Sequence, residues 1–358
     1  MSDAITQKPV IVGHRGFRKK FPENTLLSFN ATISDAQCQI IETDLQLSKD
    51  GIILINHDAE TGRTYNKNYK IQETFYENEL SLLRNLEEPH EPILTFEKLI
   101  IWFSKKNGDF RNIKLMLDIK RVNNVIILDK IIETLIKVNN DLNYWYNKII
   151  FGLWTPDFYD YAVSKQLLNN FEIVNITASI TIAKIFLEKS LKYESEFNST
   201  NHHKDDYFKM KISAISLLHI ATWSGDAFIG FYDDLLEKNV RLYLWTVNSE
   251  EDIQFCCRLG VDGIVTDNPD YAQALVTHPN NDILFKRDKN LGNFYKKENL
   301  FNLMTLTGWR RYGLYTVYKG FEAALLRGYL SINVPIINGG KETIGSYSVS
   351  ILKLLGII

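Results

Sequence analysis

The stretch PVIVGHRGFRKKFPENTLLSFNATISDAQCQIIETDLQL, residues 9–47, joins two apolar runs through a longer mixed segment. The apolar runs, Pro9–Gly13 and Gln39–Asp44, are short and rich in β-branched residues, which predicts a strand for each. A helix is predicted between them, opening at PENT, residues 22–25, because leucines and a phenylalanine follow. Two strands joined by a helix are typical of a parallel βαβ unit.

The same alternation continues to about residue 278. Strands are predicted at Pro9–Gly13, Gln39–Asp44, Ile52–Asn56, Ile113–Ile119, Lys148–Gly152, Glu172–Ile176, Ile212–Leu217, Arg241–Thr246 and Gly263–Thr266. These candidates exceed the eight strands of a barrel, so we expect one of them to be a hairpin partner. We predict an α/β fold, a (β/α)8 TIM barrel over residues 9–278, with active groups at the C-terminal ends of its strands.

The composition is that of a globular protein with balanced charge. Of the 358 residues, 45% are apolar, which allows a substantial core. The 41 basic and 43 acidic residues leave a net charge of −2, so we expect no nucleic-acid partner. Cys38, Cys256 and Cys257 lack a spaced framework, which predicts reduced, buried thiols. The opening MSDAITQKPVIVGHRG lacks a signal-peptide pattern, so we expect an intracellular protein that is not secreted.

Two segments interrupt the alternation. Residues 190–211 are polar and charged, which predicts a long exposed loop. Within it, His202, His203, Asp205 and Asp206 resemble a metal-binding cluster, but a solvated loop is the favoured interpretation. From residue 279 the composition changes again, to a charged linker and then to scattered aromatic and basic residues. We predict that residues 279–358 form a separate tail.

Polar residues stand where the first two strands end. A histidine such as His14 can act there as a base, and Arg15 beside it can hold a phosphate in a fork of donors. On the second strand, the period of two places Glu42 and Asp44 on one side. Neighbouring buried carboxylates repel unless a cation lies between them, which favours Mg²⁺ or Ca²⁺. The alternative is that both carboxylates point to solvent.

Three later segments add candidates near the same rim. His57, in NHD, closes another apolar run and supplies a second histidine. Alternation in LMLDIK, residues 115–120, places Asp118 and Lys120 on one face, as a candidate oxygen ligand and a candidate phosphate contact. Trp245, in LWTVN, is a candidate wall of the substrate pocket, with core packing as the equally favoured alternative.

Six motifs occur in an order that resembles a known family. They are HRG followed by PENT, IETDLQLSKDG, NHD, LDIK, LWTVN and VDGIVTDNP. Together they resemble the glycerophosphodiester phosphodiesterase family over about residues 10–278. The resemblance implies a TIM-barrel enzyme that hydrolyses phosphodiesters with the help of one divalent cation, Mg²⁺ or Ca²⁺.

The resemblance also implies a role for each candidate residue. The catalytic acid–base pair would be His14 and His57, the metal ligands Glu42, Asp44 and Asp118, and the residues near the phosphate Arg15 and Lys120. One departure is that many family members carry glutamate where this chain has Asp118. We expect the shorter side chain there to shift the ion or to admit a water molecule.

Within the family, the segments NHDAETGR, LMLDIK and YLWTVN resemble most the yeast phosphatidylglycerol phospholipase C branch. The resemblance implies that a substrate hydroxyl next to the phosphorylated carbon attacks phosphorus and forms a cyclic phosphate. We therefore expect phosphatidylglycerol as substrate, with diacylglycerol and glycerol phosphate as products. A soluble glycerophosphodiester phosphodiesterase and a lysophospholipase D are the nearest alternatives. A non-catalytic lipid-binding protein is the alternative from another class, but it would be expected to lose His14, His57, Glu42 or Asp44.

The tail favours a membrane partner. Its aromatic and basic residues are Trp309, Arg310, Arg311, Tyr312, Tyr315, Tyr318, Lys319, Phe321, Arg327 and Tyr329, and the sequence ends in the apolar SVSILKLLGII. Because charges interrupt every apolar run before the ~20 residues that a spanning helix needs, we expect a helix lying in the membrane interface rather than one packed onto the barrel. Peripheral or monotopic association with the cytosolic face of the endoplasmic reticulum, mitochondria or lipid droplets is the corresponding expectation.

Overall fold

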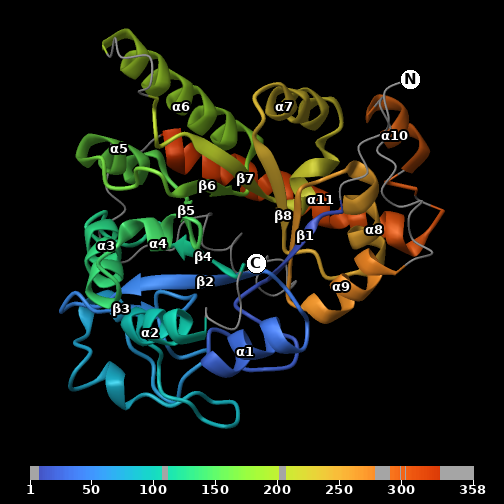
Figure 1. Ribbon diagram of the computed structural model, residues 1–358. Coiled ribbons are helices and arrows are strands. Elements are labelled where there is room, and N and C mark those ends of the chain that lie inside the picture. The colour runs from blue at the N-terminus through green and yellow to red at the C-terminus, as the bar shows by residue number, and fades with distance from the viewer. Residues whose placement is uncertain are drawn as a thin grey trace.

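The structure, a computed structural model, describes residues 8–106, 112–200, 207–278, 291–298, 300–302 and 304–330. Within these residues, eight parallel strands form a barrel in the order β1-β9-β8-β7-β6-β5-β4-β2, which the pairing of β1 with β2 closes (Figure 1). They are β1 (Val10–Gly13), β2 (Ile40–Leu47), β4 (Lys114–Ile119), β5 (Ile149–Leu153), β6 (Glu172–Thr177), β7 (Ile212–Leu218), β8 (Arg241–Trp245) and β9 (Gly263–Thr266). The predicted (β/α)8 barrel is confirmed.

Helices surround the barrel (Figure 1). They are α1 (Leu26–Ser34), α2 (Phe96–Lys106), α3 (Ile127–Val138), α4 (Leu142–Tyr146), α5 (Pro156–Lys165), α6 (Ile180–Thr200), α7 (Asp226–Glu237), α8 (Glu250–Leu259), α9 (Pro269–Thr277), α10 (Leu291–Glu298) and α11 (Leu306–Leu330). Local sequence sets their ends. The Thr25 side chain accepts a hydrogen bond from Ser28 N and so caps α1 where PENT predicted a helix start. Gly260 ends α8 in the left-handed conformation, with φ at 77°.

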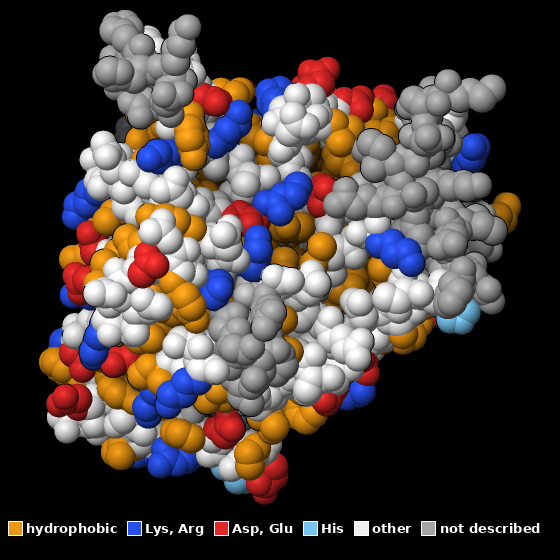
Figure 2. Space-filling view, viewed as in Figure 1, with side chains coloured by type: hydrophobic (Ala, Val, Ile, Leu, Met, Phe, Trp, Pro, Cys, Tyr) orange, Lys and Arg blue, Asp and Glu red, His pale blue; other side chains and the backbone are white. Residues whose placement is uncertain are grey.

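The barrel interior is a packed apolar core. Every residue of β5 is buried, as expected of a parallel strand that is covered on both faces. Cys38, Cys256 and Cys257 are free and buried, as predicted. On the face seen in Figure 2, basic, acidic and apolar side chains are interspersed, in keeping with the balanced composition.

The ninth predicted strand is the expected hairpin partner. It is β3 (Ile53–Ile55), which runs antiparallel to β2 with Ile55 opposite Leu45. Directly after it, Asn56 N donates a hydrogen bond to Asp44 O at 3.1 Å. The hairpin therefore delivers the following residue, His57, beside the end of β2.

Residues 56–95 form a small lobe between β3 and α2. The lobe contains two short 3-10 helices, η1 (Ile71–Glu73) and η2 (Leu80–Leu82), and has its own apolar core. That core consists of Leu54 from β3 together with the lobe residues Tyr65, Ile71, Leu80, Leu83 and Ile93. The lobe is therefore a packed unit that can hold polar side chains at the barrel rim.

The prediction of a loop over residues 190–211 is wrong for residues 190–200, because α6 continues to Thr200. Tyr193 and Phe197, four residues apart, pack against the core, and Tyr193 OH also donates to Asp160 Oδ1 at 2.6 Å. Packing of this stripe stabilises a helix whose other faces are polar. His202, His203, Asp205 and Asp206 lie outside the described residues.

The described part of the tail packs against the barrel. In α10, Tyr295 OH donates to Thr222 O at 2.6 Å. Thr222 belongs to the 3-10 helix η3 (His219–Ser224), which follows β7. In α11, Tyr318 is fully buried, and Arg311 pairs with Asp252 at 3.0 Å. One side of α11 is therefore covered by the barrel.

The described residues include only part of the predicted tail. The side chains of Arg327 and Tyr329, and the terminal SVSILKLLGII, lie outside the described residues. Among the residues that are described, no helix is long and apolar enough to cross a bilayer.

Candidate active site

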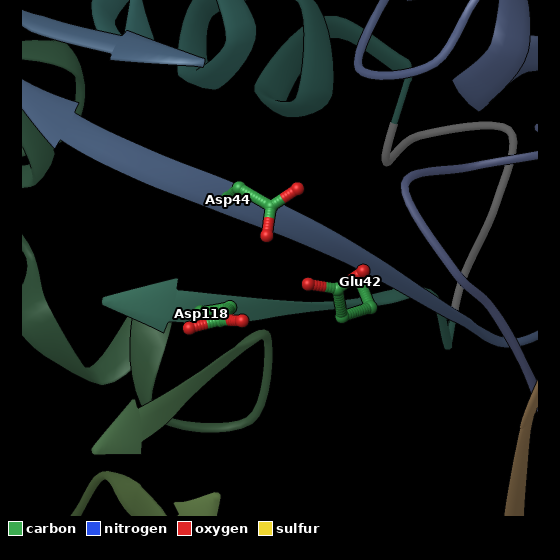
Figure 3. Close-up of side chains that lie close together, drawn as sticks. All are labelled: Glu42, Asp44 and Asp118. Atoms are coloured by element: carbon green, nitrogen blue, oxygen red, sulfur yellow. The ribbon is translucent and has the colours of Figure 1, made fainter. Parts of the chain in front are cut away.

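Three carboxylates meet at the C-terminal ends of β2 and β4. The parallel register sets Asp44 directly opposite Asp118, and the period of two brings Glu42 to the same side as Asp44. All three are buried, and one ligand oxygen from each lies within 4.8 Å of the others. Figure 3 shows the three carboxylates facing a common space between the two strands. The predicted alternative, that Glu42 and Asp44 point to solvent, is wrong.

The carboxylates form a hard oxygen donor set that fits a divalent cation. Burial raises the pKa of Glu42 well above its usual range, and the nearby Asp44 and Asp118 raise it further. A cation held by Glu42, Asp44 and Asp118 would relieve this repulsion and keep Glu42 ionised. The buried acidic triad therefore suits a metal ion, as expected from the sequence.

Lys120 lies beside the triad. Its ammonium nitrogen is 2.7 Å from Asp44 Oδ1 and 2.5 Å from Asp118 Oδ2. Burial lowers the pKa of Lys120, but the two carboxylates outweigh burial and raise it overall. Lys120 is thus a fixed positive charge beside the triad, and its predicted phosphate contact stays a prediction.

Arg15 is held by carboxylates of the chain itself. Its guanidinium lies 3.2 Å from Glu23 and 3.4 Å from Asp44, and its backbone N–H donates to Glu42 Oε2 at 2.8 Å. Arg15 therefore braces two members of the triad. Its predicted phosphate contact stays a prediction.

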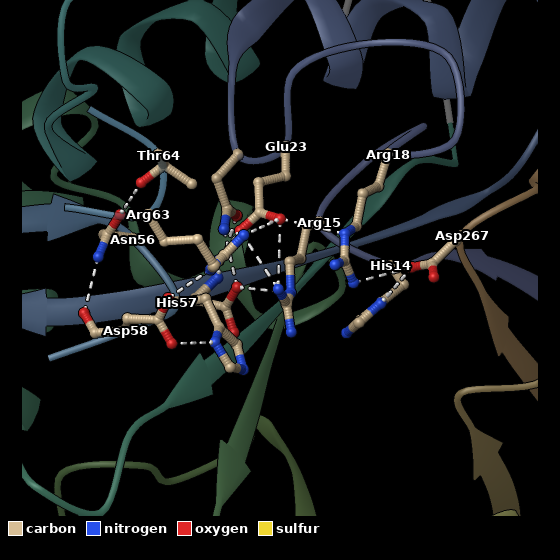
Figure 4. Close-up of polar contacts among 12 residues, drawn as sticks. His14, Arg15, Arg18, Glu23, Asn56, His57, Asp58, Arg63, Thr64 and Asp267 are labelled. Carbon is tan, nitrogen blue, oxygen red and sulfur yellow. Dashed lines mark hydrogen bonds and ion pairs between the residues drawn. The ribbon is translucent and has the colours of Figure 1, made fainter. Parts of the chain in front are cut away.

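The two histidines each have a carboxylate partner. His14, which follows β1, has Nδ1 2.6 Å from Asp267 Oδ1, and His57 has Nδ1 3.1 Å from Asp58 Oδ1. In the view of Figure 4, Arg15 lies between the two imidazoles. The structure thus brings both predicted catalytic histidines to the same end of the barrel as the triad.

Both imidazoles favour the neutral form. Burial lowers the pKa of His57 to about 3, and the charges of Arg15 and Lys120 act in the same direction. Burial and Arg15 likewise lower the pKa of His14, against the opposing effect of Asp267. A neutral imidazole can accept a proton, whereas a donor role requires a bound anion that stabilises the protonated form.

Sequence reasoning missed a network that links the lobe to the barrel. Glu23 contacts three arginines, with Arg18 at 3.1 Å and Arg63 at 2.5 Å in addition to Arg15. Arg63 Nε also lies 2.6 Å from Asp58, the partner of His57 (Figure 4). The sequence feature that could have indicated this network was the position of Glu23 inside the PENT motif.

Trp245 lies at the end of β8 and is largely buried. Its indole nitrogen donates to Ser216 O at 2.9 Å, and its ring meets that of Trp154 edge to face, with 5.7 Å between centroids. Trp154, which follows β5, donates from its own indole nitrogen to Asp118 Oδ1 at 2.6 Å. Trp245 is therefore linked to the triad through Trp154. Its role as a wall of the substrate pocket stays a prediction.

Comparison with known proteins identifies the family. Residues 14–271 match the glycerophosphoryl diester phosphodiesterase family. The chain is similar to a glycerophosphodiester phosphodiesterase of Caldanaerobacter subterraneus, with 25% identity over 271 residues, 74% of this chain and 96% of that protein. It is also similar to a human lysophospholipase D, with 22% identity over 284 residues, 72% of this chain and 83% of that protein.

The fold is shared with solved structures. A phosphodiesterase of Oleispira antarctica, in complex with the product sn-glycerol-3-phosphate, has a TM-score of 0.56 and 20% identity, and the match covers 77% of this chain and 99% of that one. Members of the matching family are metal-dependent, in agreement with the buried acidic triad. Because the family match spans most of its length, the chain belongs to the glycerophosphoryl diester phosphodiesterase family and is a phosphoric diester hydrolase.

Proposed function

We propose that the chain is a phospholipase C that cleaves phosphatidylglycerol into diacylglycerol and glycerol phosphate. The proposal selects one phosphodiester from the range of substrates of the glycerophosphoryl diester phosphodiesterase family. Besides the sequence resemblance, it rests on an apolar surface at the end of the barrel where the acidic triad lies.

That surface, called here the entry surface, consists of Met304, Leu306, Trp309 and Tyr312. Their exposed fractions are 94%, 90%, 56% and 51%, and the rings of Trp309 and Tyr312 pack edge to face. Arg310, in the same turn as Trp309, is also exposed. Aromatic side chains beside a basic one suit the interface of a bilayer that contains an anionic lipid.

Two contacts relate the entry surface to the active end of the barrel. Arg311 of α11 pairs with Asp252 in the first turn of α8, and Glu322 accepts a hydrogen bond from Ser179 Oγ at 3.1 Å. Asp252 follows β8 and Ser179 follows β6, so both lie at the C-terminal ends of strands. The triad lies at the same ends. These contacts support the proposal that a lipid surface meeting Trp309 would face the active end of the barrel.

The head group of phosphatidylglycerol offers an internal nucleophile. Its glycerol hydroxyl next to the phosphorylated carbon can attack phosphorus, expel the diacylglycerol oxygen and form a cyclic phosphate. Water then opens the ring to glycerol phosphate. The head groups of phosphatidylcholine and phosphatidylethanolamine have no such hydroxyl, so this route excludes them.

The residues of the site divide the chemistry between them. One of His14 and His57 takes the proton of the attacking hydroxyl, and the other gives a proton to the leaving diacylglycerol oxygen, for about 10²–10⁴-fold each. Lys120 provides a fixed positive charge for a phosphoryl oxygen. A divalent cation held by Glu42, Asp44 and Asp118 would supply further charge neutralisation at the phosphoryl group.

A substrate panel tests the proposal. Purified protein is incubated with vesicles of phosphatidylglycerol, phosphatidylcholine or phosphatidylethanolamine and with soluble glycerophosphocholine, with and without chelator. We expect diacylglycerol and glycerol phosphate from phosphatidylglycerol alone, and loss of activity with chelator. Equal hydrolysis of phosphatidylcholine contradicts the proposal. Preference for glycerophosphocholine, or release of a free alcohol from a lysophospholipid, assigns one of the two alternative activities.

We also propose that the entry surface binds the membrane. Deleting α11 is a poor test, since it would expose the barrel surface that buries Tyr318. The sharper variant replaces Met304, Leu306, Trp309 and Tyr312 with serine. We expect it to lose co-sedimentation with phosphatidylglycerol vesicles but to hydrolyse monomeric short-chain phosphatidylglycerol as the unmodified chain does.

The control for membrane binding changes exposed apolar residues elsewhere. Leu82 and Leu86 of the lobe are 64% and 54% exposed, so L82S/L86S removes apolar surface without touching α11. This control should co-sediment normally. Unchanged co-sedimentation of the entry-surface variant would contradict the membrane role.

A further inference from the structure

Asp267, which directly follows the last strand of the barrel, has its carboxylate beside the imidazole of His14. Strands β1 and β9 pair in parallel with Gly13 opposite Thr266, and His14 N donates to Thr266 O at 2.9 Å. The next residue, Asp267, has Oδ1 2.6 Å from His14 Nδ1. The nearest group of the network around Glu23 is Arg18, whose Nη1 lies 3.6 Å from Asp267 Oδ1, a longer contact than the one to His14.

We propose that Asp267 is a positioning residue that holds His14 as the tautomer protonated on Nδ1, which leaves Nε2 as the nitrogen that exchanges a proton with the substrate. The proposal rests on the proposed catalytic role of His14. A carboxylate can only accept, so the short contact to Nδ1 requires the proton to lie on that nitrogen. Figure 4 shows Asp267 on one side of the imidazole.

The other ring nitrogen points toward the triad. His14 Nε2 lies 4.0 Å from Glu42 Oε2, whereas Nδ1 is taken up by Asp267. A substrate held at the triad therefore meets Nε2. An imidazole with its proton on Nε2 would present a donor where a base is needed, so the tautomer decides which step His14 can perform.

Asn248 fixes the orientation of Asp267. The Asn248 side chain accepts from Asp267 N at 2.9 Å and from Thr266 Oγ1 at 3.0 Å, and its Nδ2 donates to Asp267 Oδ2 at 2.8 Å. A backbone N–H can only donate, so the amide of Asn248 cannot be turned round. The Asp267 oxygen that faces Asn248 must therefore be an acceptor.

This arrangement predicts that D267N changes the tautomer of His14. The substitution keeps the volume of the side chain and removes its negative charge. The new amide must turn its oxygen to Asn248 Nδ2, which leaves its NH₂ group facing His14 Nδ1. Because that group donates, Nδ1 must accept and the ring proton moves to Nε2. The only described competitor is Arg18, 3.6 Å from Asp267 Oδ1 and one-third exposed, and it is too distant to outweigh the 2.8 Å bond to Asn248.

Exchanging the two side chains should reverse the effect. In the double variant D267N/N248D, the carboxylate at position 248 accepts from the amide at position 267 and still accepts from the backbone N–H. The amide oxygen at position 267 then faces His14 and accepts from Nδ1. The net charge of the pair is unchanged, so the double variant isolates the tautomer from the charge.

The test reads the tautomer directly. Full-length protein with ¹⁵N-labelled histidine is loaded with Mg²⁺, and the ring nitrogens of His14 are assigned by comparison with H14Q. Spectra are recorded at pH 7.5, about one unit above the ordinary pKa of histidine, and the ring nitrogen shifts show directly which nitrogen carries the proton. We expect the proton on Nδ1 in the unmodified chain, on Nε2 in D267N, and again on Nδ1 in D267N/N248D.

Turnover of phosphatidylglycerol should follow the tautomer. We expect kcat of D267N to fall about 10²–10⁴-fold with KM changed less than about threefold, and D267N/N248D to regain at least tenfold of the loss. The control D270N makes the same chemical change three residues on, where Asp270 pairs with Lys20 at the surface, and should leave both readouts unchanged.

Two results overturn the proposal. One is a proton on Nε2 of His14 in the unmodified chain. The other is a D267N enzyme that keeps the Nδ1 proton or full kcat. If the unmodified chain cleaves no phosphodiester, the proposed function fails instead, and the spectrum still decides the tautomer.

Discussion

The indole nitrogen of Trp154 lies 2.6 Å from Asp118 Oδ1, while Lys120 Nζ lies 2.5 Å from the other oxygen of the same carboxylate. Trp154 stands at the end of β5 and Asp118 on the neighbouring β4. Both oxygens of a short side chain are therefore held from two directions. This bracing fixes the orientation of the short Asp118 side chain within the triad.

The first prediction concerns metal affinity in W154F. The variant keeps an aromatic ring but removes the indole N–H that donates to Asp118. The Asp118 carboxylate then loses one of its two hydrogen-bond donors. We expect Mg²⁺ to bind about 10–100-fold more weakly to the purified protein, measured by calorimetric titration. The control W245F removes an indole donor that bonds Ser216 O instead, and should leave the affinity unchanged. Equal affinities in W154F and the unmodified chain would contradict the role of Trp154.

The second prediction concerns stability in E23Q. Glu23 is buried among Arg15, Arg18 and Arg63, which lower its pKa to about 2 although burial alone would raise it. Removing its charge leaves the arginines without their shared partner, and we expect the free energy of unfolding to fall by about 3–5 kcal/mol.

Urea denaturation at pH 7 measures this loss. The matched control is E73Q, because Glu73 pairs with Lys70 on the surface with both side chains mostly exposed. An exposed pair contributes at most about 1 kcal/mol. Similar losses in E23Q and E73Q would show that the buried ion pairs of Glu23 contribute no more to the free energy of unfolding than an exposed pair does.

The third prediction concerns acid stability without metal. Burial lowers the pKa of His57 to about 3 in the folded chain, against 6.5 as the ordinary value. Between these values the unfolded chain binds the proton and the folded chain does not, so stability falls as pH drops below 6.5. The contribution of this group is at most about 1.4 kcal/mol per pH unit.

Comparison with H57Q isolates the effect. Urea unfolding of both proteins in chelator at pH 7, 6 and 5 should show a steeper loss for the unmodified chain, because the variant lacks this proton uptake. Parallel losses would mean that His57 is not held neutral in the folded chain.

The fourth prediction concerns the attachment of α11. Arg311 and Asp252 are both largely buried, so R311A should loosen α11 from the barrel. We expect limited proteolysis to remove the tail faster by at least tenfold while the barrel resists. R310A changes the exposed neighbouring arginine and should leave the cleavage rate unchanged.

Much of the site was predictable from sequence because it is built from the first strands in chain order. Glu42 and Asp44 share one strand, and Asp118 stands opposite Asp44 on the neighbouring strand of the barrel. For such residues, the period of two and the alignment of strand ends are enough to predict proximity. His14 follows from the same rule, since β1 pairs with β2.

The remaining parts depend on contacts that no local pattern encodes. The pairing of Asp267 with His14 spans 253 positions and requires the ring of strands to close. The continuation of α6 past Ser190 depends on packing of Tyr193 and Phe197 against the core, which outweighs a polar composition typical of loops. The bracing of Asp118 likewise comes from Trp154, which belongs to another strand end.

The seam between β1 and β9 joins the beginning of the catalytic barrel to its end. His14 has its partner Asp267 only when the last strand is in place, so a nascent or truncated chain that carries every triad residue still lacks an oriented histidine. If Asp267 positions His14 as proposed, we expect no hydrolysis until synthesis of the barrel is complete. On the same proposal, turnover would indicate that the whole ring of strands has closed.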